Sequence, residues 1–237
     1  MPQLPFEQFP ALSAIGISLH IFTQRIPGID VSHNKAEALA RLEKAHREIR
    51  KAIGVGDWPL VTAEQIHGNK IAMVDKPLGT DKEFSGCDGI ITNQRRVALG
   101  IYVADCCAVY IVDPSTPAIG LVHSGRKGTE LGVVTNAIRQ MIDRFGSDPT
   151  KMIVQLSPCV RPPHYEIDFA AKIVEQCKAQ GLLEIHNRGV CTACHLDLYY
   201  SYRAEKGRTG RMLGLIGLTP HNCELEKTTR RVSSLLR

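Results

Sequence analysis

Apolar positions follow two patterns along the chain: short continuous runs, and a spacing of three to four residues. The spaced pattern predicts helices, because residues three or four apart share one helical face. It occurs in Asn34–Ile53, which Ser32 or Asn34 could cap, in Gly128–Phe145 and in Phe169–Ala179.

The continuous apolar runs predict strands, and they are densest in the middle of the chain. Turn-forming residues separate them, and near-continuous apolarity is typical of strands covered on both faces. The segment 77–86 is predicted as a loop. The predicted strands are Ile17–Phe22, Leu60–Ile66, Lys70–Val74, Gly89–Thr92, Val97–Val103, Ala108–Val112, Ala118–Val122, Met152–Leu156 and Met212–Leu218.

These strands do not alternate regularly with helices. The pattern therefore favours an α/β (α+β) fold, with a large mixed β-sheet core flanked by helices, over a doubly wound parallel sheet. The 237 residues contain no internal repeat and no linker-like segment. The last residues, 227–237, are predicted to be a frayed basic tail.

Composition narrows the function classes. Apolar residues make up 43% and charged residues 22% of the chain, which excludes a disordered tail protein. A net charge of +5 and only 5% aromatic residues argue against a nucleic-acid partner. The most apolar stretch, Val97–Val112, is interrupted by Asp105, so we expect no membrane partner.

The chain has eight cysteines, and its first residues do not resemble a secretory signal. We therefore expect a cytoplasmic protein with reduced thiols rather than a disulfide framework. In that setting, a cysteine near histidines is a candidate metal ligand or nucleophile.

Three motifs place such residues at strand–loop junctions. They are Gln65-Ile66-His67-Gly68, Ala104-Asp105-Cys106-Cys107 and His123-Ser124-Gly125. One thiolate and two imidazoles suit Zn²⁺, and three protein ligands leave a fourth position open, which is the pattern of catalytic zinc sites. Each residue also has an ordinary interpretation, as a hydrogen-bonded histidine or a small buried thiol.

Three further segments have more than one interpretation each. Gly125–Gly128 could cradle a phosphate before a helix or simply connect a strand to it. The Cys191-Thr192-Ala193-Cys194 motif, which His195 follows, could be half of a zinc site, a redox pair, a haem attachment motif or a purely structural segment. The basic stretch Tyr199–Arg211, which contains Arg203, Lys206, Arg208 and Arg211, could bind an anion or be a solvated loop.

Taken together, the motifs resemble the YfiH/laccase-domain family, whose members have been called multicopper polyphenol oxidases and purine nucleoside phosphorylases. The resemblance runs from about Phe22 to Leu218 and rests on the order of the motifs. The segments that carry it are Phe22-Thr23-Gln24-Arg25, Asn34-Lys35, Gln65-Ile66-His67-Gly68, Cys87-Asp88-Gly89-Ile90-Ile91-Thr92, Ala104-Asp105-Cys106, His123-Ser124-Gly125, Cys191-Thr192, Tyr199-Tyr200-Ser201-Tyr202-Arg203 and Thr209-Gly210-Arg211.

The resemblance implies a single YfiH-like domain over 1–237, with a zinc ion held by His67, Cys106 and His123. It implies a zinc-dependent purine nucleoside phosphorylase acting on adenosine, inosine, guanosine or methylthioadenosine, with adenosine deamination as a companion activity. The expected partners are a purine nucleoside and phosphate, and the expected state is a monomer or small homo-oligomer.

Several residues are assigned roles on this basis. His67, Cys106, His123 and Asp105 are the predicted catalytic residues, with Asp105 orienting a ligand or accepting a proton. The predicted phosphate or substrate ligands are Arg25, Asn34 and Lys127, and Asp88 is a weaker candidate for support of the metal ligands.

The chain also departs from the family pattern. His123-Ser124-Gly125-Arg126-Lys127-Gly128 stands where the family has His-Ala-Gly-Trp-Arg-Gly, so an aromatic residue is lost and an arginine becomes Lys127. A lysine binds phosphate as a point charge and does not clamp it with two parallel bonds. These differences keep open a non-enzymatic zinc- or nucleoside-binding protein.

Two other enzyme classes remain. In a cysteine hydrolase or amidase, Cys106 would be the nucleophile and His67 or His123 its base. A copper-dependent, laccase-like polyphenol oxidase with four coppers needs on the order of ten histidine ligands. The chain has nine histidines in all, which argues against that class, although copper could still bind.

Overall fold

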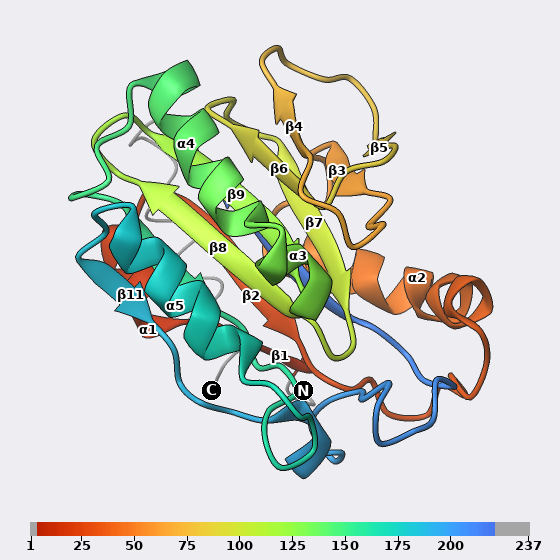
Figure 1. The fold of residues 1–237 in the computed structure, drawn as a ribbon. Coiled ribbons are helices and arrows are strands. Elements are labelled where there is room, and N and C mark those ends of the chain that lie inside the picture. The colour runs from red at the N-terminus through yellow and green to blue at the C-terminus, as the bar shows by residue number, and fades with distance from the viewer. Residues whose placement is uncertain (1–3, 221–237) are drawn as a thin grey trace.

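The structure, a computed structural model, describes residues 4–220 and contains two six-stranded mixed β-sheets with helices around them (Figure 1). The predicted mixed α/β class is confirmed. The prediction of one large sheet is refined, because the strands are divided between two sheets.

The first sheet has the order β1-β2-β12-β7-β3-β5. Its centre joins distant parts of the chain: β12 pairs antiparallel with β2 on one side and with β7 on the other. Strands β3 and β5 then extend the sheet in parallel from β7. The bounds are β1 Phe6–Glu7, β2 Ser18–Thr23, β3 Leu60–Ala63, β5 Lys82–Phe84, β7 Ala98–Val103 and β12 Met212–Leu218.

The second sheet has the order β11-β10-β8-β9-β6-β4. Its four central strands are antiparallel neighbours, and β11 and β4 are added in parallel at the two edges. The bounds are β4 Ile71–Val74, β6 Gly89–Thr92, β8 Cys107–Asp113, β9 Ala118–Ser124, β10 Ile153–Leu156 and β11 Glu184–His186.

Capping residues and glycines determine where the helices begin and end. Asn34 and Asp168 cap α2 and α5, since each side chain accepts a hydrogen bond from a backbone N–H in the first turn. The helix predicted over Gly128–Phe145 is two helices, because Gly132 adopts a left-handed conformation between them (φ 71°). The bounds are α1 Pro10–Ile15, α2 Lys35–Ala52, α3 Arg126–Glu130, α4 Val133–Phe145, α5 Phe169–Ala179 and the short 3₁₀ helix η1 Thr192–Cys194.

Two apolar clusters form the core. The first joins the facing sides of the two sheets, and includes Leu99, Leu213, Tyr110 and Leu121. The second lies between the other face of the second sheet and helices α4 and α5, which lie over that face in Figure 1. The central strands β8 and β9 are therefore covered on both faces, as their continuous apolar runs predict.

The remaining differences from the sequence prediction are at the edges. The predicted loop 77–86 contains the short strand β5, whose polar residues give no apolar alternation. Strands β1 and β11 and helix α1 were not predicted. The predicted tail 227–237 lies outside the described residues. In the part of the chain described, no helix is both long and apolar enough to cross a membrane.

Candidate metal centre and cavity

His67, Cys106 and His123 meet at one point, although they come from three separate parts of the chain. His67 follows β3, Cys106 lies between β7 and β8, and His123 is near the end of β9. One ligand atom from each residue lies within 4.8 Å of the others. His67 is exposed, Cys106 is partly buried and His123 is 4% exposed, so the cluster spans from solvent to core.

The loop that carries His67 is held in a strained conformation. Gln65 and His67 both have left-handed backbones, with φ of 62° and 59°. The Gln65 amide compensates, because it donates to the carbonyl oxygen of Tyr102 (2.6 Å) and accepts from the backbone N of Tyr102 (3.0 Å). This reciprocal pair ties the His67 loop to β7, which leads directly to Cys106.

Asp88 supports two of the three residues. Its Oδ1 lies 2.8 Å from Nδ1 of His123 and accepts from the backbone N of His67, while its Oδ2 accepts from the backbone N of Gly68. Burial would raise the pKa of Asp88, but these contacts outweigh it and lower the pKa. A buried carboxylate therefore orients the imidazole of His123 and fixes the His67 loop.

The thiol and imidazole at this point favour each other's charged forms. Burial would raise the pKa of Cys106, but the positive charge of His123 and hydrogen bonds with both imidazoles lower it to about 6. Burial would lower the pKa of His123, but the negative charge of Cys106 and the bond to Asp88 raise it to about 9. The thiolate, which is the form that binds metal, is thus stabilised.

The donor set fits a metal ion. Because Asp88 occupies Nδ1 of His123, Nε2 remains for a metal, as in carboxylate–histidine–zinc arrangements. Glycine is required beside the thiolate, because a Cβ at Gly125 would collide with Sγ of Cys106. Two imidazoles and one thiolate are ligands that zinc accepts, with one position left for another ligand.

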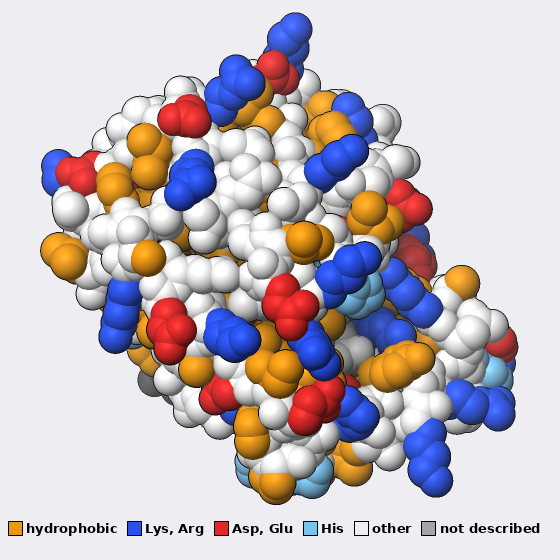
Figure 2. All heavy atoms as spheres, in the orientation of Figure 1, with side chains coloured by type: hydrophobic (Ala, Val, Ile, Leu, Met, Phe, Trp, Pro, Cys, Tyr) orange, Lys and Arg blue, Asp and Glu red, His pale blue; other side chains and the backbone are white. Residues whose placement is uncertain are grey.

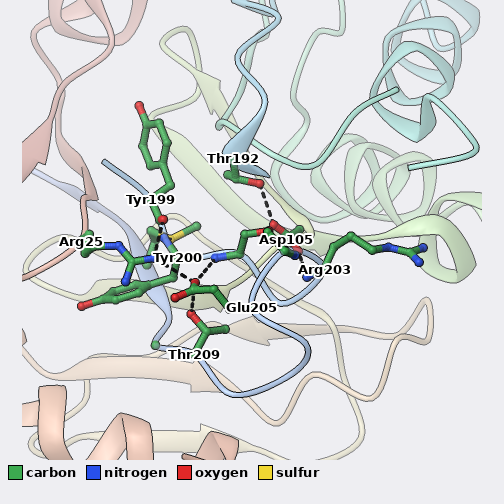
Figure 3. Close-up of polar contacts among 12 residues, drawn as sticks. Arg25, Asp105, Thr192, Tyr199, Tyr200, Arg203, Glu205 and Thr209 are labelled. Carbon is green, nitrogen blue, oxygen red and sulfur yellow. Dashed lines mark hydrogen bonds and ion pairs between the residues drawn. The ribbon is translucent and has the colours of Figure 1, made fainter. Parts of the chain in front are cut away.

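Asp105, which precedes Cys106, is engaged on both carboxylate oxygens. Its Oδ1 accepts from the hydroxyl of Thr192 (2.7 Å) and its Oδ2 from the backbone N of Arg203 (2.7 Å). Figure 3 shows Asp105 between these two residues, each from a different segment of the C-terminal part of the chain. The carboxylate therefore joins the Cys106 loop to the segments around Thr192 and Arg203.

A cavity of about 700 Å³ opens beside the three candidate ligands. Its walls combine aromatic and cationic side chains, and Figure 2 shows Lys and Arg side chains gathered around a hollow on this face. The lining residues are Lys35, Gln65, His67, Tyr102, Ala104, Asp105, Cys106, His123, Arg126, Val160, Tyr165, Phe169, Tyr202, Arg203, Lys206 and Arg211.

Arg211 is distinctive among the cations. It is 7% exposed, and its Nη1 donates to the backbone carbonyl oxygens of Thr209 and Gly210. Within residues 4–220 it forms no ion pair with a carboxylate, whereas Arg126 and Arg203 both pair with Glu166. A buried guanidinium without an acidic partner at a cavity wall favours an anionic ligand.

The predicted phosphate and substrate ligands lie elsewhere. Arg25 is not among the lining residues: it forms an ion pair with Glu205 (2.9 Å) and donates to the carbonyl oxygen of Tyr199, as Figure 3 shows. Asn34 caps α2 through the backbone N of Glu37. Lys127 is on α3 and does not line the cavity. The geometry gives Arg25 and Asn34 structural contacts, and the ligand role of all three stays a prediction.

Neighbouring residues take the positions next to the cavity instead. Lys35 follows Asn34, and Arg126 precedes Lys127, so each predicted ligand was one residue from a lining cation. The basic stretch after Tyr199 supplies three lining cations, while Arg208 donates to the carbonyl oxygen of Ser32. Nothing in the sequence identified Tyr165 and Phe169 as lining residues, because their approach to the cavity depends on how α5 packs in the fold.

Comparison with known proteins places the chain among relatives. Residues 14–181 and 166–219 match a family model described as multi-copper polyphenol oxidoreductase laccase. The chain belongs to this family. Within the laccase-domain family it is 30% identical to a purine nucleoside phosphorylase of Streptomyces coelicolor, over 73% of this chain and 81% of that protein. It is 28% identical to a purine nucleoside phosphorylase of Streptomyces griseus, over 86% of this chain and 90% of that protein.

Solved structures of the family share the fold. YlmD from Geobacillus stearothermophilus superimposes with a TM-score of 0.79 at 22% identity, covering 92% of this chain and 100% of that chain. YfiH from Bacillus licheniformis gives a TM-score of 0.73 at 21% identity, covering 85% and 93%. The resemblance to the YfiH/laccase-domain family is therefore confirmed.

Proposed function

We propose that this chain catalyses phosphorolysis of purine nucleosides in the cavity beside His67, Cys106 and His123. The relatives named purine nucleoside phosphorylase support this reaction class. The observation that carries the proposal is the position of Arg211, which is buried and has no acidic partner among residues 4–220, in the wall of the same cavity as the three candidate metal ligands. The volume of about 700 Å³ is in the range that small-molecule ligands occupy.

The metal we propose is zinc, held by the thiolate of Cys106 and the imidazoles of His67 and His123. A bound zinc ion would supply a Lewis acid at the cavity floor. Asp88 orients His123 and the His67 loop, so its role is to preserve the donor set.

In phosphorolysis, a phosphate oxygen forms a bond to C1′ of the ribose while the bond from C1′ to the purine nitrogen breaks. The purine leaves with the electron pair of that bond and takes up a proton, and the sugar leaves as its 1-phosphate. Arg211, Arg203 and Lys206 are the cations available to hold the phosphate and offset its charge. Because both Asp105 oxygens already accept hydrogen bonds, we assign Asp105 the role of positioning Arg203.

Aromatic side chains provide a surface for the nucleoside. Tyr202 is 54% exposed and lines the cavity, and Tyr165 lies under the guanidinium of Arg203, 4.8 Å from its ring centroid. Planar rings of this kind stack on purines. The cavity wall therefore contains other aromatic side chains, although this chain lacks the aromatic residue that the family has after Gly125.

The test is phosphate-dependent release of hypoxanthine from inosine by the purified protein, with elemental analysis of the same sample. We expect turnover with stoichiometric zinc, and loss of both in His67→Ala. The matched control is His186→Ala, since His186 is on β11 and does not line the cavity. Equal turnover by His67→Ala and the wild type would show that the candidate metal centre takes no part in the reaction.

The same assay separates the alternatives. Conversion of adenosine to inosine without phosphate would establish the companion deamination, and adenine release with phosphate would establish phosphorolysis. Copper in place of zinc, with oxidation of a polyphenol, would favour the laccase-like class. A metal-free protein in which Cys106 is alkylated at neutral pH would favour the cysteine hydrolase. Tight inosine binding without turnover would favour a nucleoside-binding protein.

A further inference from the structure

The Cys191-Thr192-Ala193-Cys194 segment forms a tight turn beside the cavity, and the proposed reaction does not use its thiols. The backbone N of Cys194 donates to the carbonyl oxygen of Cys191 (3.2 Å), which closes the turn around η1. The Cys191 thiol, whose Sγ lies 3.9 Å from the carbonyl oxygen of Arg161, raises the pKa of the neighbouring Cys194 thiol. Cys191 is 7% exposed, whereas Cys194 is exposed and open to a reagent.

This geometry suits a disulfide. A turn closed between residues three apart holds their Cα atoms within about 7 Å, and disulfides span Cα separations of roughly 4.4–6.8 Å. Two cysteines separated by two residues are the arrangement found in redox-active dithiols. Both thiols are free in this structure.

A second thiol pair serves as a comparison. Cys107 and Cys159 are also neighbours, since each thiol shifts the pKa of the other, but both are fully buried. A dissolved oxidant has no access to them in the folded protein. Access therefore distinguishes the Cys191–Cys194 pair from the Cys107–Cys159 pair.

The turn is connected to the cavity wall through Thr192, which lies between the two cysteines. Thr192 is fully buried, and its hydroxyl donates to Oδ1 of Asp105. The other oxygen of Asp105 accepts from the backbone N of Arg203, which lines the cavity (Figure 3). Any change in the turn that moves Thr192 thus acts on the carboxylate that holds the Arg203 backbone.

We propose that Cys191 and Cys194 form a redox-active dithiol that closes to a disulfide on reaction with a low-molecular-weight disulfide, and that closure loosens the Asp105–Arg203 contact in the cavity wall. In the first step the Cys194 thiolate attacks the reagent disulfide, which gives a mixed disulfide and releases one thiolate. The Cys191 thiol then gives up its proton and attacks the Cys194 sulfur, which releases the second thiolate. Two protein thiols are oxidised, and one reagent disulfide is reduced to two thiols.

The modification is tested with glutathione disulfide, alkylation of the remaining thiols after denaturation, and peptide mapping by mass spectrometry. The protein carries Cys223→Ser, because Cys223 lies outside the described residues and must not contribute a third thiol. We expect one peptide in which Cys191 and Cys194 are linked with loss of two hydrogens, reversed by a dithiol reductant. A lasting glutathione adduct on Cys194 with Cys191 still alkylated, or both thiols alkylated, would overturn the proposal.

The coupling to the wall is tested by amide hydrogen exchange at Arg203, which requires no catalytic activity. We expect loss of protection at this amide on oxidation, and no change in Cys194→Ser treated in the same way. Equal protection before and after a verified disulfide forms would refute the coupling. The variant Thr192→Val separates disulfide formation from the coupling to Arg203. In this variant the disulfide should still form, but oxidation should cause no further change in the protection of the Arg203 amide.

The effect on catalysis rests on the proposed function. Oxidation should raise the KM for phosphate in inosine phosphorolysis by a factor of roughly 2 to 30, the range of coupling found between linked sites. Cys194→Ser should show no such change. If the reduced protein does not turn over inosine, the proposed function fails. The linked peptide and the hydrogen exchange at Arg203 still test the dithiol proposal, because neither measurement requires catalytic activity.

Discussion

Nδ1 of His123 lies 2.8 Å from Oδ1 of Asp88, and the same carboxylate accepts hydrogen bonds from the backbone N of His67 and of Gly68. One buried acid thus positions two of the three candidate metal ligands. It also connects β6, where Asp88 immediately precedes the strand, to the end of β9. The arrangement makes Asp88 the most direct test of how the donor set is held.

Asp88→Asn should weaken zinc binding by roughly 10- to 100-fold, because an amide does not supply the negative charge that orients and polarises the imidazole. Competition with a fluorescent zinc chelator measures the affinity. The matched control is Asp113→Asn, a carboxylate that is equally buried but accepts from Ser115 and Thr116 instead. Comparable zinc affinity in the two variants would show that Asp88 is not needed by the metal ligands.

Gly125→Ala tests the close approach of the backbone to Cys106. A methyl group at this position would collide with Sγ, so either the thiolate or the Gly125 turn must move. We expect less zinc per chain by elemental analysis, with the protein still folded by circular dichroism. Gly79→Ala is the control, since no atom lies within 4 Å of its added Cβ. Full zinc content in Gly125→Ala would contradict the steric argument.

The sequence motifs indicated the three residues that meet at the candidate metal centre, and Asp88 as a support for them, but not the two sheets that hold them. Strands such as β8 and β9 follow from their apolar runs, and the three motifs lie at the strand ends as expected. The division into two sheets could not be predicted, because it depends on β12 pairing with β2 and β7 from far along the chain. The spacing of apolar residues within a segment gives no information about which distant segment it pairs with.

The positions of the predicted ligands depend on the same kind of non-local packing. Arg25 was chosen from a local motif, yet its partner Glu205 is 180 residues away. Arg126 and Lys127 are adjacent on α3, and only the direction of the helix decides which of them lines the cavity. Residue type and spacing identify candidate cations, but the packing of the fold determines which ones reach the site.

Arg211→Lys should raise the KM for phosphate in inosine phosphorolysis more than Arg126→Lys does. A lysine keeps the charge at either position but loses the planar donor set that binds an anion with parallel bonds. The guanidinium of Arg211 has no acidic partner in the described structure, whereas Arg126 is already paired with Glu130 and Glu166. Initial rates over a phosphate series measure both constants. A larger change in the KM for phosphate in Arg126→Lys would indicate that phosphate binds nearer to α3.

Arg25→Met should lower the free energy of unfolding by roughly 1–2 kcal/mol, because it removes a partly buried ion pair and a bond to a backbone carbonyl. The KM for phosphate of the folded variant should stay unchanged. Urea unfolding of Arg25→Met, Glu205→Gln and the double variant measures the pair as a double-mutant cycle. An increased KM for phosphate with unchanged stability would instead support Arg25 as a phosphate ligand.

Two buried histidines should make the fold sensitive to mild acid. His20 and His46 are 1% and 3% exposed, and burial lowers the pKa of each from 6.5 to about 4. Because the unfolded chain takes up the protons first, the free energy of unfolding should fall as the pH drops from 6.5 toward 4 and change little above 6.5. Each histidine should account for about 2 kcal/mol of the loss between pH 7 and pH 5.

His46→Leu isolates this effect, because it removes a titrating ring whose Nε2 has no hydrogen-bond partner in the described structure. Urea unfolding at pH 7 and pH 5 should show a smaller loss of stability in this variant than in the wild type, by about 2 kcal/mol. Contributions from the metal ligands are shared by both proteins and cancel in the difference. His186→Leu, at the partly exposed strand β11, is the matched control. An unchanged loss of stability in His46→Leu would show that His46 is already protonated, or solvated, within the folded protein.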